Sequence, residues 1–170
     1  KALILPLFIM PLMAFAQLNL QVISHKGDPI LLGEVNRAGL EAAPFGNWFQ
    51  PTYEAYQVDK AVLANANLEG IDLLVFMGTW CEDSQRELPH FYKILDHLGF
   101  PEQRLRVVAL DNHPDRRKTS PDGAEKGWNI EYVPTFIFLK NGIEMGRIVE
   151  TPMATLEKDM VGILSKTSGL

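Results

Sequence analysis

Short apolar runs in this 170-residue chain indicate the strands of a sheet. The clearest run, Ile71–Met77, is almost wholly apolar, which is typical of a central strand covered on both faces. Residues 18–23 alternate between apolar and polar side chains, which predicts a half-buried strand. The complete set of expected strands covers residues 18–23, 71–77, 105–110, 136–139 and 143–149. Asn141-Gly142 separates the last two and predicts a tight hairpin.

Apolar residues recur at helical spacing in three longer stretches. The expected helices cover residues 61–68, 82–98 and 151–164. Asp59 is a good N-cap for the first of them, and Pro89 lies inside the second. In the third, we expect Met153, Leu156, Met160, Ile163 and Leu164 to share one face.

Proline-containing pairs predict two further short helices. Asp28-Pro29 begins one that ends at Gly39, and Ser120-Pro121 begins one that continues through Lys126. Residues 41–56 show no period, so we expect an irregular segment held in place by its aromatic side chains. An aromatic platform for a sugar or peptide is the functional alternative for that segment.

The order of these elements predicts an α/β domain with a mixed central sheet flanked by helices. Residues 60–170 form this domain, and residues 17–59 precede it as an N-terminal extension. The first 16 residues belong to neither part. Ala2–Ala16 is an unbroken apolar run that ends in Ala-Phe-Ala, the small-residue pattern of a signal peptidase site.

That N-terminal run predicts a secretory signal peptide, because it is shorter than the roughly 20 apolar residues that a membrane-spanning helix needs. We therefore expect an exported protein, periplasmic or extracellular, with no membrane association after cleavage. An uncleaved membrane anchor is the competing interpretation.

Composition narrows the classes of function. The chain has 16 Lys and Arg residues against 21 Asp and Glu, a net charge of −5, which argues against nucleic-acid binding. One cysteine allows neither an intramolecular disulfide nor a cysteine-cluster metal site. His90 and His97 are seven residues apart, whereas metal ligands on one helix are three or four apart, so no metal or other cofactor is expected.

The single thiol, Cys81, lies where the buried strand 71–77 gives way to the predicted helix 82–98. Backbone N–H groups at a helix start favour a thiolate, while the carboxylates of Glu82 and Asp83 oppose it. Ser84 lies one turn further and can donate a hydrogen bond to the sulfur. For a lone cysteine, a small buried apolar side chain is the alternative.

Two motifs favour a reactive thiol at Cys81 over a buried apolar side chain. Trp80-Cys81-Glu82-Asp83-Ser84 resembles the active-site turn of the thioredoxin superfamily, and residues 132–142, with Val133-Pro134-Thr135, resemble its cis-proline loop and following hairpin. The resemblance covers residues 60–170. It implies a thioredoxin-like fold in which Cys81 is the nucleophile, Trp80 covers its flank and Ser84 assists. It also implies a cis bond before Pro134, with residues 133–135 forming a substrate groove beside the sulfur.

This chain departs from the family pattern at three places. Ser84 replaces the usual second cysteine, Glu82-Asp83 replaces the usual Gly-Pro, and Val75 stands where many thioredoxins have a buried carboxylate. A hydroxyl cannot attack a mixed disulfide, so release needs an outside thiol. The resemblance therefore implies a thiol–disulfide oxidoreductase or isomerase without its resolving cysteine.

Its expected activity is monothiol exchange with cysteine-containing proteins or low-molecular-weight thiols, in redox homeostasis outside the cytoplasm. The main alternative is a non-catalytic thioredoxin-fold module that binds a peptide or protein. A thiol that senses peroxide is a third alternative.

Overall fold

The computed structural model describes residues 17–165. The expected signal peptide, residues 1–16, lies outside the described residues. The described elements, in chain order, are β1 (Leu20–Ile23), β2 (Pro29–Val35), α1 (Arg37–Glu41), α2 (Gly46–Ala55), α3 (Lys60–Leu63), β3 (Ile71–Met77), α4 (Glu82–His97), η1 (Glu102–Arg104), β4 (Leu105–Ala109), η2 (Pro114–Arg116), β5 (Thr135–Lys140), β6 (Ile143–Val149) and α5 (Leu156–Leu164).

Six strands form one sheet in the order β1-β2-β4-β3-β5-β6. The central strands β3 and β4 are parallel and are connected through α4, whereas every other neighbouring pair is antiparallel. The sheet is therefore mixed, as the sequence predicts. Strand β2 joins the sheet beside β4, so residues of the expected N-terminal extension are part of the same sheet.

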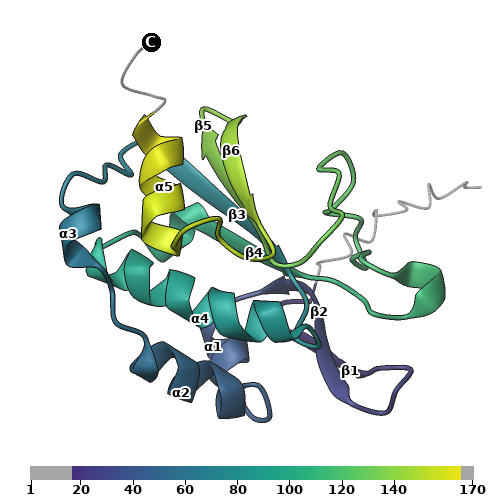
Figure 1. Ribbon diagram of the computed structural model, residues 1–170. Coiled ribbons are helices and arrows are strands. Elements are labelled where there is room, and N and C mark those ends of the chain that lie inside the picture. The colour runs from purple at the N-terminus through teal and green to yellow at the C-terminus, as the bar shows by residue number, and fades with distance from the viewer. Residues whose placement is uncertain (1–16, 166–170) are drawn as a thin grey trace, which may run out of the picture.

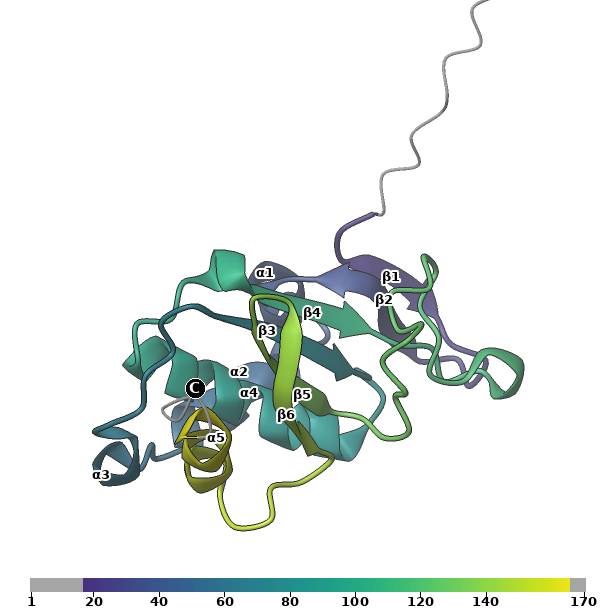
Figure 2. The same cartoon turned by 90° about the horizontal axis from the view of Figure 1, so that it is seen from above.

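The helices cover one face of this sheet (Figures 1 and 2). A core cluster joins Leu40 of α1, Phe49 of α2, Phe91 of α4 and Met160 of α5 to the sheet, and all four side chains are fully buried. At about 25 cal/mol per Å² of apolar surface, this contiguous cluster is the main source of folding free energy.

A long connection between β4 and β5, rather than a helix, covers the opposite face. Phe76 and Ile137 of the sheet are fully buried there, packed with Trp128 and Ile130 of this connection. The helix expected from Ser120 through Lys126 is wrong, because these residues form turns. The Ser120 side chain does accept a hydrogen bond from the Ala124 N–H, but it closes one turn and no helix follows.

Two predictions for the N-terminal part are also wrong. The stretch after Asp28-Pro29 is strand β2, where Pro29 is the first residue and Ile30 and Leu31 are buried. A proline fits the first position of a strand as well as that of a helix. The expected irregular segment contains helix α2, which includes Pro51 and buries Phe49.

The remaining elements agree with the predictions except at their ends. Helix α4 begins at Glu82, and Asp59 caps α3 by accepting a hydrogen bond from the Val62 N–H. Helix α5 begins only at Leu156, capped by Thr155, so the expectation that Met153 shares its buried face is wrong. Met153 is 98% exposed. Within residues 17–165, no helix has both the length and the apolar character needed to cross a membrane.

Candidate functional site

Cys81 occupies the junction between the C-terminal end of β3 and the first turn of α4. A tight turn places it there, because its N–H donates to the Gly78 carbonyl at 2.9 Å and its carbonyl accepts from the Gln85 N–H at 2.9 Å. Cys81 is the N-cap residue of α4 and its side chain is partly exposed. A thiol at this place can be reached by another molecule.

The hydrogen bond of the sulfur differs from the expected one. Cys81 Sγ lies 3.2 Å from the carbonyl oxygen of Val133, to which its S–H donates. Its side chain makes no capping hydrogen bond with a helix N–H. The sulfur thus contacts the loop before Pro134, 52 residues away in the chain.

The two carboxylates after Cys81 differ in their surroundings. Asp83 forms an ion pair with Arg86 at 2.6 Å, which offsets part of its charge, whereas Glu82 is exposed. Arg86 also contacts the carboxylate of Glu87 at 2.7 Å. The hydrogen bonds that Arg86 donates to the carboxylates of Glu87 and then Asp83 raise the pKa of its guanidinium. The carboxylate pair after the cysteine therefore opposes a thiolate less than two free charges would.

Ser84 is fully buried under the active-site turn. Its Oγ accepts a hydrogen bond from the Gly78 N–H at 3.2 Å, so it joins the end of β3 to the first turn of α4. Assistance by Ser84 to a Cys81 thiolate stays a prediction.

Trp80 lies against the active-site turn and is held there by a hydrogen bond from its indole N–H. The indole Nε1 donates to the Leu110 carbonyl at 2.8 Å, and the Arg117 guanidinium lies 5.8 Å from the centre of the ring. A Cβ added to Gly78 would lie 2.6 Å from the Trp80 ring, so only glycine fits under the indole. The turn and the loop after β4 therefore hold this aromatic ring beside the cysteine.

The loop around Pro134 is fixed at both ends. The Val133–Pro134 peptide bond is cis. Thr135 Oγ1 donates to the Tyr132 carbonyl at 2.7 Å, and the Pro134 carbonyl accepts from the Glu150 N–H at 2.7 Å. Val133, Pro134 and Thr135 are buried residues, and the atom of this segment that contacts the sulfur is the Val133 carbonyl oxygen.

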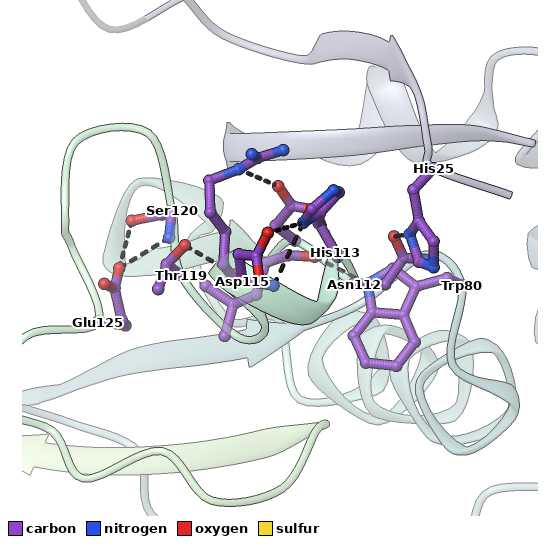
Figure 3. A network of polar contacts seen from close by, with 11 residues as sticks. His25, Trp80, Asn112, His113, Asp115, Thr119, Ser120 and Glu125 are labelled. Atoms are coloured by element: carbon purple, nitrogen blue, oxygen red, sulfur yellow. Dashed lines mark hydrogen bonds and ion pairs between the residues drawn. The ribbon is translucent and has the colours of Figure 1, made fainter. Parts of the chain in front are cut away.

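The histidines set aside in the sequence have other surroundings. His90 stacks on Tyr56 with ring centres 4.0 Å apart. His25 and His113 form an edge contact within a polar network along the loop after β4, which reaches Asn112 beside Trp80 (Figure 3). Residues 17–165 contain no cluster of three potential metal ligands.

The structure also shows residues that the sequence did not indicate as a site. Trp80 lines a cavity of about 440 Å³ together with Lys26, Trp48, Asn112 and Arg117. These residues come from four separate segments of the chain. The spacing of these residues in the sequence does not indicate that they lie together. The aromatic segment near residue 48 and the basic run 116–118 each form one wall of the cavity, through Trp48 and Arg117.

This architecture defines the class of protein. A mixed sheet with a cysteine at the strand-to-helix junction, facing a cis-proline loop on the neighbouring strand β5, is the arrangement of a thioredoxin fold. The usual second cysteine of the turn is replaced by Ser84.

Comparisons with known proteins agree with this class. The chain is 26% identical over 117 residues to a thioredoxin H-type of Populus jackii, covering 69% of this chain and 70% of the relative. It is 27% identical over 119 residues to thioredoxin H9 of Arabidopsis thaliana, with the same coverage. A solved structure of a Pseudomonas aeruginosa protein of unknown function shares the fold, with a TM-score of 0.52 and 19% identity over 81% of this chain and 93% of that one. No family model matches.

These relatives, together with the thioredoxin fold, support a member of the thioredoxin superfamily. Its thioredoxin relatives support redox thiol–disulfide exchange as the general class of its chemistry.

Proposed function

We propose that this protein is exported and performs monothiol thiol–disulfide exchange through Cys81. One observation carries the proposal: Cys81 is a partly exposed residue and its sulfur lies 3.2 Å from the Val133 carbonyl, against the cis-Pro134 loop. A partner chain that binds beside this loop, at the 50% exposed Tyr132, brings its own sulfur to Cys81. The expected partners are cysteine-containing proteins and low-molecular-weight thiols.

The proposed exchange needs two displacements. Cys81 first loses its proton to solvent, and the thiolate attacks one sulfur of a partner disulfide. A bond forms between Cys81 and that sulfur, and the other sulfur leaves as a thiolate. A second thiolate from solution, such as that of glutathione, then attacks the mixed disulfide and regenerates Cys81. No net oxidation or reduction of the protein results from the pair of steps.

The replacement of the second cysteine supports the monothiol form of this chemistry. Ser84 lies one turn after Cys81 and its oxygen is engaged by the Gly78 N–H. A serine oxygen cannot form a disulfide, so the mixed disulfide is resolved by a thiol from another molecule. Export is supported by the apolar leader that ends in Ala-Phe-Ala.

A glutathionylated peptide tests the exchange. With free glutathione present, the wild-type protein should release the peptide thiol at least about tenfold faster than the uncatalysed background, and Cys81→Ser should return the rate to background. The release is measured by chromatography of the reduced peptide. Ser165→Ala, a change at an exposed serine, serves as the control and should keep the wild-type rate.

Equal rates for the wild type and Cys81→Ser would eliminate the enzymatic proposal. The thioredoxin-fold binding module would then be the remaining function. Alkylation of Cys81 by iodoacetamide gives a second measurement, since a sulfur that no reagent reaches cannot exchange disulfides.

A further inference from the structure

A cavity opens beside the active-site turn, at the C-terminal ends of the parallel strands β3 and β4. Its volume is about 440 Å³, which is in the range of small-ligand sites. Four segments build it: the β1–β2 turn, the start of α2, the active-site turn with the start of α4, and the loop after β4. The first two segments belong to residues 17–59, the part of the chain outside the thioredoxin resemblance.

The polar groups in this cavity include two cationic donors against one carboxylate, that of Asp28, beside the hydroxyl of Thr79 and the amides of Gln85 and Asn112. Lys26 and Arg117 supply two cationic side chains. Asn112 Oδ1 is engaged by His25 Nδ1 at 3.2 Å, which leaves its amide NH₂ as the group free to donate (Figure 3). A donor-rich cavity fits an acceptor that carries negative charge.

Arg117 differs from the other arginines of residues 17–165. Each of the others lies within 4.0 Å of a carboxylate oxygen of this chain. Arg117 has only a ring contact, with Trp80 at 5.8 Å. Its guanidinium can therefore form a two-bond contact with a carboxylate from another molecule.

The charge of the cavity is opposite to that of the chain. Asp28 is the one carboxylate among the lining residues, against the two cations of Lys26 and Arg117. The whole chain carries a net charge of −5. The other walls include the side chains of Phe45, Trp48 and Trp80, which suit the apolar part of a peptide-like ligand.

We propose that this cavity binds a carboxylate of the molecule whose sulfur reacts with Cys81. Trp80 lines the cavity and directly precedes Cys81, so one partner can reach both places. This inference rests on the proposed exchange function for its biological use. The carboxylate can come from an acidic side chain near the partner cysteine of a protein or from glutathione itself.

Binding without chemistry tests the cavity. The probes are two short peptides that differ only in Glu or Gln beside an S-methylated cysteine, and S-methylglutathione as a third. The protein is the full chain with Cys81→Ser, and binding is followed by NMR shifts of the Asn112 amide and the Trp80 indole. The Glu peptide or S-methylglutathione should bind at least about tenfold more tightly than the Gln peptide.

Matched variants in the same background locate the contact. Arg117→Gln should weaken the Glu peptide or S-methylglutathione about tenfold. Lys118→Gln is the control, because Lys118 lies over the Tyr132 ring and does not line the cavity, and it should change binding less than twofold. Asp28→Asn removes the opposing charge and should tighten binding severalfold.

The outcomes separate the two proposals. The cavity proposal is overturned if the Glu and Gln peptides bind with equal affinity and S-methylglutathione does not bind. It is also overturned if Arg117→Gln and Lys118→Gln lose equal binding affinity. Carboxylate-dependent binding in a protein whose Cys81 does not exchange disulfides overturns only the proposed function. Binding of the Glu peptide would identify an acidic side chain of a partner protein as the source of the carboxylate, and binding of S-methylglutathione would identify glutathione.

Discussion

The buried hydroxyl of Ser84 has a structural role that can be separated from any role in exchange. Ser84 Oγ is the acceptor for the N–H of Gly78, a buried residue at the end of β3. A hydrogen bond between these two atoms keeps the active-site turn closed over the helix start. Loss of the oxygen leaves a backbone donor without its partner inside the protein.

We predict that Ser84→Ala destabilises the fold by about 1–3 kcal/mol, because it leaves the buried Gly78 N–H unsatisfied. The free energy of unfolding is measured by urea denaturation. Ser165→Ala is the matched control: Ser165 is exposed and its Oγ donates to the Gly162 carbonyl, so a change within about 0.5 kcal/mol is expected. Equal losses in both variants would contradict this role of Ser84.

At the level of single residues, the sequence identified Cys81 and the Pro134 loop but not their contacts. The resemblance of these two motifs to the thioredoxin superfamily implied that the two lie together, and Cys81 Sγ lies 3.2 Å from the Val133 carbonyl oxygen. The hydrogen bond of Cys81 to the Val133 carbonyl depends on side-chain rotation, which no pattern encodes. Arg117 and its neighbour Trp80 are 37 residues apart in the chain, so no local pattern indicates their contact.

Among the elements, helix α5 is joined to the start of α3 by one buried carboxylate. Glu157 is 1% exposed and accepts hydrogen bonds from the Tyr56 hydroxyl at 2.9 Å and the Asp59 N–H at 3.1 Å. Burial, and next the hydrogen bond to Glu157, raise the pKa of the Tyr56 phenol. The carboxylate thus holds two separate parts of the chain against α5.

We predict that Tyr56→Phe lowers the free energy of unfolding at pH 7 by about 1.5 kcal/mol, because a donor to a buried carboxylate is lost. The raised pKa means that the contribution is complete below the unfolded pKa of tyrosine and is lost as pH rises through the folded one. Urea denaturation at pH 7 measures the effect. Tyr132→Phe, at a 50% exposed tyrosine, should change stability by less than about 0.5 kcal/mol. A loss as large as that of Tyr56→Phe would argue against the Glu157 contact.

At the level of elements, long stretches with a uniform hydrophobic pattern predicted the observed element. Short stretches with a mixed pattern did not. Strand β3 was predicted with its observed bounds, because a run of seven mostly apolar residues has few alternatives. Pro29 misled the prediction for β2, since proline begins strands and helices alike. Helix α2 was not predicted, because it contains Pro51. Its apolar face is buried against Tyr92 of α4, a contact that no local pattern shows.

For the whole molecule, acid stability depends on Glu87. This residue is 6% exposed and contacts Arg86 at 2.7 Å and His90 at 3.7 Å. Burial raises the pKa of its carboxyl, but the hydrogen bonds from His90 and Arg86 outweigh burial, so the pKa lies below its ordinary value of 4.5. A depressed folded pKa contributes stability above the unfolded pKa that is lost as pH falls through the folded one.

We predict that the free energy of unfolding of the wild type falls as pH is lowered from 6 to 3, and that this fall is smaller in Glu87→Gln. Urea denaturation at both pH values measures the difference. Glu82→Gln is the control, since Glu82 is exposed in the same helix, and its fall should match that of the wild type. Equal falls in all three proteins would show that Glu87 carries none of the acid sensitivity.

The turn between β1 and β2 has a consequence for how this protein family can diversify. The turn contributes Lys26 and Asp28 to the wall of the cavity, yet residues 25–28 are exposed and lie outside both core clusters. We expect side-chain changes at Lys26 and Asp28 to leave the sheet intact, because the core does not depend on these side chains. Changes at these two surface positions can therefore alter which ligand the cavity prefers while the reactive centre stays the same.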